Sequence, residues 1–131
     1  MYKNDVLRGI LLGVARHNLT IYANEKAKLG YSVNFSLNIR GDELFLRAVK
    51  RSLLQFGVKS KLKSEESSRR KRPLLKITGI VNLKIISDLL PIVPNYRNDL
   101  NEFKQIVDII NKNKHKTLNG LEMLMKIKGV L

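Results

Sequence analysis

The clearest pattern in the chain is a strict alternation of apolar and polar residues over positions 31–40, which predicts a β-strand with one apolar and one polar face. The same period of two runs from 18 to 24. The polar segment 25–30 ends in a glycine and predicts a hairpin loop between these two strands.

Two further strands are predicted later in the chain. Lysines alternate with other residues over 58–63, and alternate positions are apolar over 71–78, with Leu75 and Ile77 facing inward. Pro73 cannot donate a hydrogen bond to a ladder, so it predicts an edge position for the last strand.

Apolar residues spaced three and four apart predict the helices. Asn4-Asp5, Asp42 and Thr117 are expected to cap the first, second and last of them. Pro91 and Pro94 are expected to end the third helix, ahead of a loop at 95–98. The predicted helices are 4–16, 43–55, 82–90, 100–110 and 118–128.

The order helix, strand, strand, helix, strand, strand, helix, helix, helix predicts one α+β domain over residues 1–131. We expect a four-stranded antiparallel sheet whose apolar face is covered by helices and whose other face is polar and basic.

The first predicted helix has two glycines four residues apart, Gly9 and Gly13, which lie on one face. Glycine inside a helix costs roughly 0.5–1 kcal/mol relative to alanine, so its presence favours close packing against a partner helix. A core helix with two tolerated glycines is the alternative. The apolar run is shorter than the ~20 residues that span a membrane.

The net charge of the chain indicates the class of its binding partner. Twenty-five lysines and arginines against eleven acidic residues give a net charge of +14, which favours a polyanionic partner, usually nucleic acid. An anionic membrane and a ribosome-like structural role are the rivals, but the basic residues follow strands and loops rather than one amphipathic helix. The chain has no cysteine, so disulfides and thiolate metal sites are excluded. No signal peptide is visible, and we expect a cytoplasmic, nucleoid-associated protein.

The polar positions of the predicted sheet carry amides and hydroxyls without acidic residues, which suits hydrogen bonding to base edges of double-stranded DNA. An ordinary exposed face is the alternative. The candidates for base contacts are Asn18, Thr20, Tyr22, Asn24, Ser32, Asn34, Ser36, Asn38 and Arg40. The candidates for phosphate contacts are Lys59, Lys61, Lys63, Arg69, Arg70, Lys71, Arg72, Lys76, Lys112, Lys114 and Lys116.

The element order and the segment Leu7-Arg8-Gly9-Ile10-Leu11-Leu12-Gly13-Val14-Ala15 resemble the LAGLIDADG homing endonucleases. Leu7 and Gly9 match the nine-letter motif outright, and Gly13 falls where the family has alanine or glycine. The resemblance implies a saddle-shaped sheet over the DNA major groove and, with one motif in the chain, a homodimer whose motif helices pack at a two-fold axis. The interface residues it implies are Leu7, Gly9, Ile10, Leu12 and Gly13.

The sequence departs from the family at the catalytic position. The second acid of the motif binds the divalent metal that activates water, and Val14 stands there; Leu12 stands at the first acid. A shifted alignment places Asn18 at the metal position, which is again no acid. Magnesium prefers carboxylate ligands. The resemblance therefore implies a protein that binds DNA but is not an enzyme, without catalytic residues, metal or cofactor.

Other chemistry is poorly supported. The family's late lysine near the scissile phosphate corresponds to Arg97 or Lys104. His17 and His115 are far apart and lack a second ligand at metal spacing, and His17 is expected on the DNA face or at a helix end. No phosphate loop or nucleophile motif indicates a small-molecule substrate.

Two alternatives remain open at this stage. One is a working endonuclease whose metal is held by another acid, of which Asp5, Glu25 and Asp42 are nearest to the first helix and sheet. The other is a nucleoid-architectural protein or an RNA-binding splicing helper. Metal-dependent nicking would support the first, and binding without sequence preference, or competition by structured RNA, the second.

Overall fold

The computed structural model describes residues 2–91 and 98–130, with the side chain of residue 98 left out. Its elements in chain order are α1 (Asn4–Val14), β1 (Arg16–Ala23), β2 (Tyr31–Arg40), α2 (Glu43–Leu54), β3 (Lys61–Lys63), β4 (Leu74–Thr78), α3 (Ile80–Leu89), α4 (Asn98–Asn111), the 3₁₀ turn η1 (Lys114–Lys116) and α5 (Leu118–Lys128). The predicted α+β order is confirmed.

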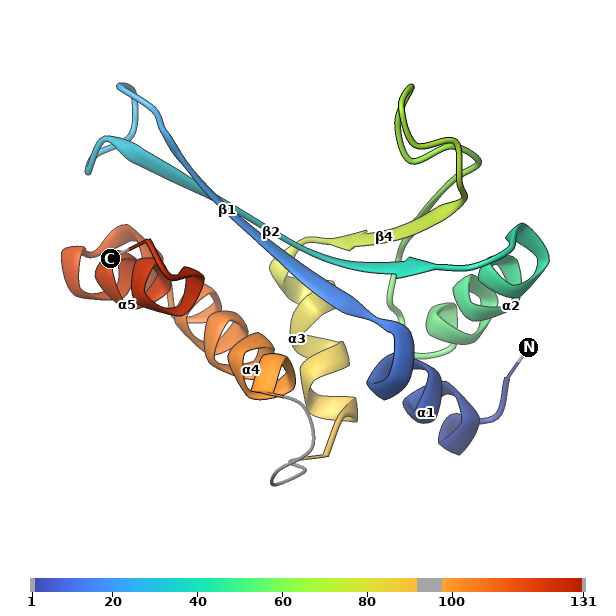
Figure 1. The fold of residues 1–131 in the computed structure, drawn as a ribbon. Coiled ribbons are helices and arrows are strands. Elements are labelled where there is room, and N and C mark those ends of the chain that lie inside the picture. Colours follow the sequence, from blue (N-terminus) through green and yellow to red (C-terminus); the bar gives the residue numbers. More distant parts are fainter. Residues whose placement is uncertain (1, 92–97, 131) are drawn as a thin grey trace.

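The four strands form one antiparallel sheet in the order β1-β2-β4-β3. The helices of the described residues lie under one face of the sheet, and the β1–β2 hairpin and the β3–β4 connection rise from the other face as two arms (Figure 1). The sheet is therefore a saddle with one covered and one open face, as expected.

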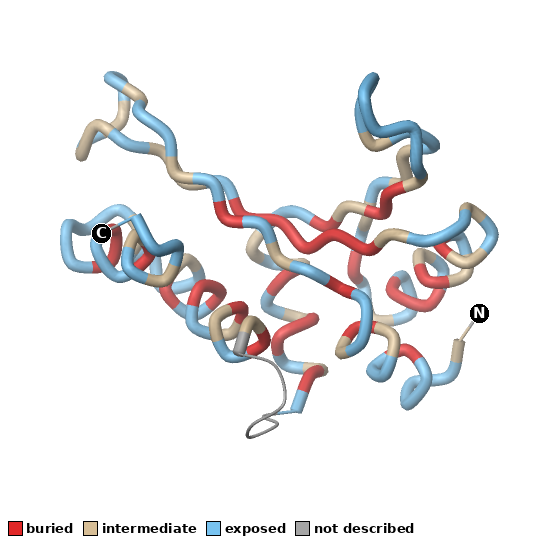
Figure 2. The backbone as a smooth tube through the Cα atoms, in the orientation of Figure 1, coloured by how far each residue is buried: buried red, intermediate tan, exposed pale blue. Residues whose placement is uncertain are grey.

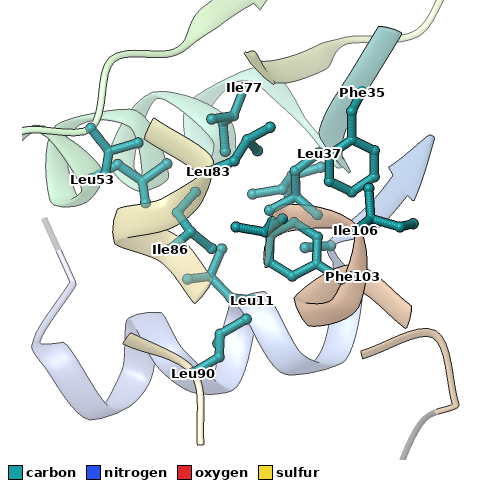
Figure 3. Packing of buried hydrophobic residues seen from close by; sticks show 14 of the residues in the cluster. Leu11, Phe35, Leu37, Leu53, Ile77, Leu83, Ile86, Leu90, Phe103 and Ile106 are labelled. Atoms are coloured by element: carbon teal, nitrogen blue, oxygen red, sulfur yellow. The ribbon is translucent and has the colours of Figure 1, made fainter. Parts of the chain in front are cut away.

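The core lies between the covered face of the sheet and the helices. Phe35, Leu37 and Ile77 project from the strands onto side chains of α1, α2, α3 and α4 (Figure 3). Ile39, Leu75 and Ile77 are completely buried. Because side chains alternate across a strand, the residues between these core positions must point to the open face.

The start of the chain differs from the prediction in two details. Lys3, not Asn4-Asp5, occupies the N-cap position of α1 and makes no side-chain cap, while Asp5 lies in the first turn, 3.6 Å from Arg8. The helix ends at Val14, because Ala15 is already extended and Arg16 pairs with Asn38 in the sheet.

Strands β3 and β4 are shorter than predicted because neighbouring elements take up their flanks. Val58 is buried in the core, and the N–H of Lys59 donates to the side chain of Asn82 in α3 instead of to a ladder. β4 lies between β2 and β3, so the edge position predicted from Pro73 is wrong. Pro73 directly precedes the first paired residue and interrupts no ladder bond.

The later helices largely follow the prediction. α3 begins two residues earlier than expected, where Gly79 at φ 88° turns the chain out of β4. Thr117 caps α5, its side chain accepting a hydrogen bond from the N–H of Gly120. Asp42 occupies the N-cap position of α2 without a side-chain bond. The predicted roles of Pro94 and the loop 95–98 fall at least partly outside the described residues.

Candidate nucleic-acid interface

The open face of the saddle is built from rows of paired residues on neighbouring strands, which point to the same side of the sheet. These rows combine amides and hydroxyls with lysines and arginines. They are Tyr22–Ser32, Thr20–Asn34, Asn18–Ser36–Thr78, Arg16–Asn38–Lys76–Lys61 and Arg40–Leu74–Lys63. The structure thus brings most of the predicted base-contact residues onto one surface, together with Lys61, Lys63 and Lys76.

The arms of this face are exposed, but its middle is not (Figure 2). Ser36 is 5% and Asn38 9% exposed, so the middle of the polar face is covered in the free protein. Both lie in the inner strand β2, and the long side chains of Arg16 and Lys76 flank Asn38 in its row. The Oδ1 atom of Asn38 accepts no hydrogen bond from the residues that the structure describes.

Asn24 lies just beyond β1 and holds the hairpin together. Its Nδ2 donates to the hydroxyl of Ser32 at 2.7 Å, and its Oδ1 accepts from the N–H of Lys26 at 3.1 Å. These bonds fix the shape of the arm that carries Tyr22.

Arg16 is a residue of the open face that the sequence analysis did not predict. Its guanidinium donates to the carbonyl oxygens of Ala15 at 2.9 Å and Gly13 at 3.3 Å, so a positive charge lies at the C-terminal end of α1, where the helix dipole favours it. The alternation that predicts β1 extends back to Arg16, two residues before Asn18, and that signal was available in the sequence.

The loop between β3 and β4 carries the basic run Arg69–Arg72 and is closed by internal hydrogen bonds. The N–H of Glu66 donates to the carbonyl of Arg72 at 2.8 Å, and the N–H of Ser67 donates to that of Arg70 at 3.0 Å. The second arm is therefore an ordered loop that displays its arginines above the sheet.

Glu66 forms ion pairs with three arginines at this arm. Its carboxylate lies 2.6 Å from Nε of Arg40 and 3.5 Å from both Arg70 and Arg72. The hydrogen bond from Arg40 lowers the pKa of Glu66 below its ordinary 4.5; burial opposes the shift, and the charges of Arg40, Arg72 and Arg70 add to it. Glu66 is therefore ionised at neutral pH.

Of the remaining predicted phosphate contacts, Lys59, Lys112 and Lys114 lie away from the open face, whereas Lys116 lies at its edge. Lys59 precedes β3 and is exposed beside α3. Lys112 pairs with Asp108 at 3.1 Å, and Lys114 lies in η1, at the junction of α4 and α5. Lys116 lines a hollow of about 430 Å³ with Tyr22 and Asn34, beside the edge of β2 that β4 leaves unpaired.

Two hollows involve residues of the open face. One, of about 500 Å³, reaches from the open face to the helices: Asn18, Asn34, Ser36 and Thr78 line it together with Leu83, Ile110 and His115. The other, of about 440 Å³, lies between β1, β2 and the second arm and is lined by Arg16, Asn38, Arg40, Lys63, Lys76, Glu66 and Arg70 among others. Such a surface offers hydrogen-bond donors and acceptors within a strongly positive field.

The outer face of α1 is apolar and open. An ideal Cβ on Gly9 or Gly13 would meet nothing within 4 Å, and Val6 and Val14 are 50% and 44% exposed. Leu7, in contrast, is 1% exposed inside the chain's own core, so its predicted place in a dimer interface is wrong. Ile10 and Leu12 are half-buried against that core.

The end of α1 does not fit a divalent metal. The side chain of Val14 offers no oxygen ligand, and the carbonyls of Gly13 and Ala15 already accept hydrogen bonds from the Arg16 cation. Among the described residues, no three acids or histidines lie close enough together to hold a metal ion.

His17 and Lys104 lie on the covered side of the sheet, which corrects two predictions made from the sequence. His17 packs there between Phe35 and Phe103, with ring centroids 5.8 and 6.5 Å away, and lies 3.5 Å from Glu102. Lys104 donates to the carbonyl of Ser87, and burial lowers its pKa. Neither faces the open surface, and Arg97 lies outside the described residues.

Comparison with solved structures identifies the architecture. The homing endonuclease I-TnaI superposes with a TM-score of 0.79 at 20% identity, over 96% of this chain and 85% of its own. The I-LtrWI LAGLIDADG homing endonuclease bound to target DNA gives 0.80 at 20% identity, over 99% of this chain. The chain has the LAGLIDADG homing-endonuclease fold. The LAGLIDADG meganuclease I-CpaMI bound to uncleaved DNA gives 0.77 at 22% identity, over 98% of this chain.

The length of the match differs among these neighbours. The chain spans 44% of I-LtrWI and 45% of I-CpaMI, so it has less than half the length of either LAGLIDADG protein. No protein-family model matches the chain, and no curated protein matches it in sequence. None of the described helices is long and apolar enough to cross a membrane.

Proposed function

We propose that residues 1–131 form a single DNA-binding domain that binds double-stranded DNA as a homodimer and does not cleave it. The open basic face of the saddle carries this proposal. It combines cations with amide and hydroxyl groups on one surface, and the major groove is wide enough to admit β-strands. The structural neighbours I-LtrWI and I-CpaMI are bound to DNA. We propose that the protein is found with nucleoid DNA.

The homodimer is supported by α1. Its outer face has room beside Gly9 and Gly13 for a second backbone and exposes Val6 and Val14 to solvent. Two copies of this chain would also approach the length of I-LtrWI, of which one copy spans 44%. A two-fold dimer favours a pseudo-palindromic site of roughly 20 base pairs, about two helical turns.

Loss of cleavage is supported by the end of α1. Val14 stands where the motif has its metal-binding acid, and Arg16 places a cation on the adjoining carbonyls. Magnesium is usually held by one or two carboxylates, and neither side chain supplies one. No cofactor or small-molecule substrate is part of the proposal.

One selection experiment tests these points together. The protein is incubated with a randomised duplex pool in magnesium at near-physiological salt, and both the bound DNA and any new ends are sequenced. We expect a two-fold motif and no new ends. Bound DNA without a motif would point to an architectural role, and competition by structured RNA would point to an RNA-binding one.

Metal-dependent endonuclease activity is the second candidate, because structural neighbours such as I-TnaI are homing endonucleases. Discrete new ends that appear with magnesium and vanish with a chelator would establish it and overturn the inference from Val14.

A further inference from the structure

Glu66 is the only carboxylate among the residues that line the 440 Å³ hollow, within the part of the chain described here. A lone acid is unexpected on a surface that attracts a polyanion. It joins the end of β2 to the second arm through its bond to Arg40, and its side chain is only 13% exposed.

The bond to Glu66 orients Arg40. Its Nε donates to Oε1 of Glu66 at 2.6 Å, and the two terminal NH₂ groups of Arg40 make no further hydrogen bond with the described residues. The Arg40 side chain is 35% exposed and lines the hollow. An arginine anchored at Nε presents its outer donors in a fixed direction.

Asn38 supplies an independent sign that this hollow receives a ligand. It lies two residues before Arg40 on the same face of β2, is 9% exposed and lines the same hollow. Its Oδ1 has no partner among the described residues. A buried polar atom without a partner is costly in the free protein, and a ligand donor would satisfy it.

We propose that Arg40, Asn38 and Glu66 form a guanine-reading subsite, in which the outer NH₂ groups of Arg40 bind O6 and N7 of guanine and Glu66 is the positioning residue. Oδ1 of Asn38 accepts from the amino group of an adjacent cytosine or adenine. The geometry matches the bidentate pairing of arginine with guanine in the major groove. This subsite rests on the proposed DNA-binding function.

Charge favours a base over a phosphate as the ligand of Arg40. The ionised carboxylate beside Nε compensates part of the arginine charge and would repel a phosphate brought to the same guanidinium. The acceptors of guanine are neutral and carry no such penalty. Arg69, which lies in the same arm without contact to Glu66, is left to the phosphate backbone.

The test compares base preference and salt dependence among variants in the duplex selection. Arg40→Lys keeps the charge but removes the two-pronged donor, so we expect guanine preference at one position of each half-site to fall roughly five- to hundredfold. The salt slope, which is the slope of the logarithm of the binding constant against the logarithm of the salt concentration, should stay unchanged. Arg69→Ala is the matched control. It should lower the affinity for all duplex sequences alike and lower the salt slope by about one, while the guanine preference stays unchanged.

Glu66→Gln tests the positioning role. It keeps the shape of the side chain and removes its charge, so guanine preference should fall while affinity for unrelated duplexes and the salt slope both rise. A purely structural acid would change the affinity for all duplexes in the same proportion and leave the guanine preference unchanged. Far-ultraviolet circular dichroism shows whether each variant is folded.

The outcomes separate this inference from the proposed function. If the wild type selects a motif and Arg40→Lys retains its guanine preference, the subsite is wrong and the proposed function stands. If the wild type binds no duplex or selects no motif, the sequence-specific function fails and the subsite fails with it.

Discussion

Gly120 in the first turn of α5 lies directly against the carbonyl oxygen of Lys114, at 1.8 Å from the position that a Cβ would occupy. The helix can pack on η1 only because this residue has no side chain. Alanine is normally the better helix former by up to about 1 kcal/mol. At position 120 the contact with Lys114 makes alanine less stable than glycine.

We therefore expect Gly120→Ala to lower the free energy of unfolding by roughly 1–3 kcal/mol, the usual effect of overpacking. Urea denaturation followed by circular dichroism measures it. Asn119→Ala is the control, because Asn119 is exposed in the same turn and should change stability by less than about 0.5 kcal/mol. Equal stabilities of the two variants would contradict the packing of α5 on η1.

Gly13→Leu should separate the proposed dimer. The monomer has room for the side chain, so folding should be retained, while the added bulk fills the space that a second α1 would need. Sedimentation velocity over a range of concentrations measures the change in mass. Asn101→Leu adds the same side chain to an exposed position of α4 and should leave the dimer intact. A Gly13→Leu variant that still sediments as a dimer places the interface elsewhere.

Lys61→Ala should weaken binding to every duplex and lower the salt slope by about one, because it removes one cation from the open face. Titrations at several salt concentrations give the slope. Lys84→Ala is the control, since Lys84 lies in α3 under the covered face and pairs with Asp88 at 2.8 Å. Loss of affinity in the control alone would place the DNA on the helical side.

Acid should destabilise the protein through His115. Burial lowers the pKa of His115 below its ordinary 6.5, and the charge of Lys116 lowers it further. The unfolded chain therefore binds the proton first as the pH falls, and stability is lost from about pH 6.5 down to the lowered pKa. In His115→Gln this loss should be absent, as measured by the difference in denaturation midpoint between pH 8 and pH 5. An equal change in denaturation midpoint between pH 8 and pH 5 in both proteins would contradict this role of His115.

Ile39→Ala should cost about 2–5 kcal/mol in unfolding free energy, because Ile39 is completely buried between the sheet and the helices. Leu44→Ala in α2 is the comparison. Leu44 is 80% exposed although it is apolar, so its loss should change stability by less than about 0.5 kcal/mol. Chemical denaturation of both variants measures the contrast.

Much of the fold could be predicted from the sequence. The alternation over 31–40 identifies β2 and assigns Phe35, Leu37 and Ile39 to the core, because side chains in a strand point to opposite faces in turn. The hairpin, the helix order and the Thr117 cap follow from equally local rules. The candidate surface was predictable for the same reason, since paired strands keep their polar positions on one side.

What the sequence determined by itself was therefore the set of elements and the face that each would bury, because those properties depend on residues near one another in the chain. Only the tertiary structure placed β4 between β2 and β3, turned Leu7 into the core and covered Ser36 and Asn38. It alone brought Glu66 to Arg40, which is 26 residues away. Such relationships depend on which segments pack together, and a pattern with period 2 or 3.6 carries no information about partners distant in the chain.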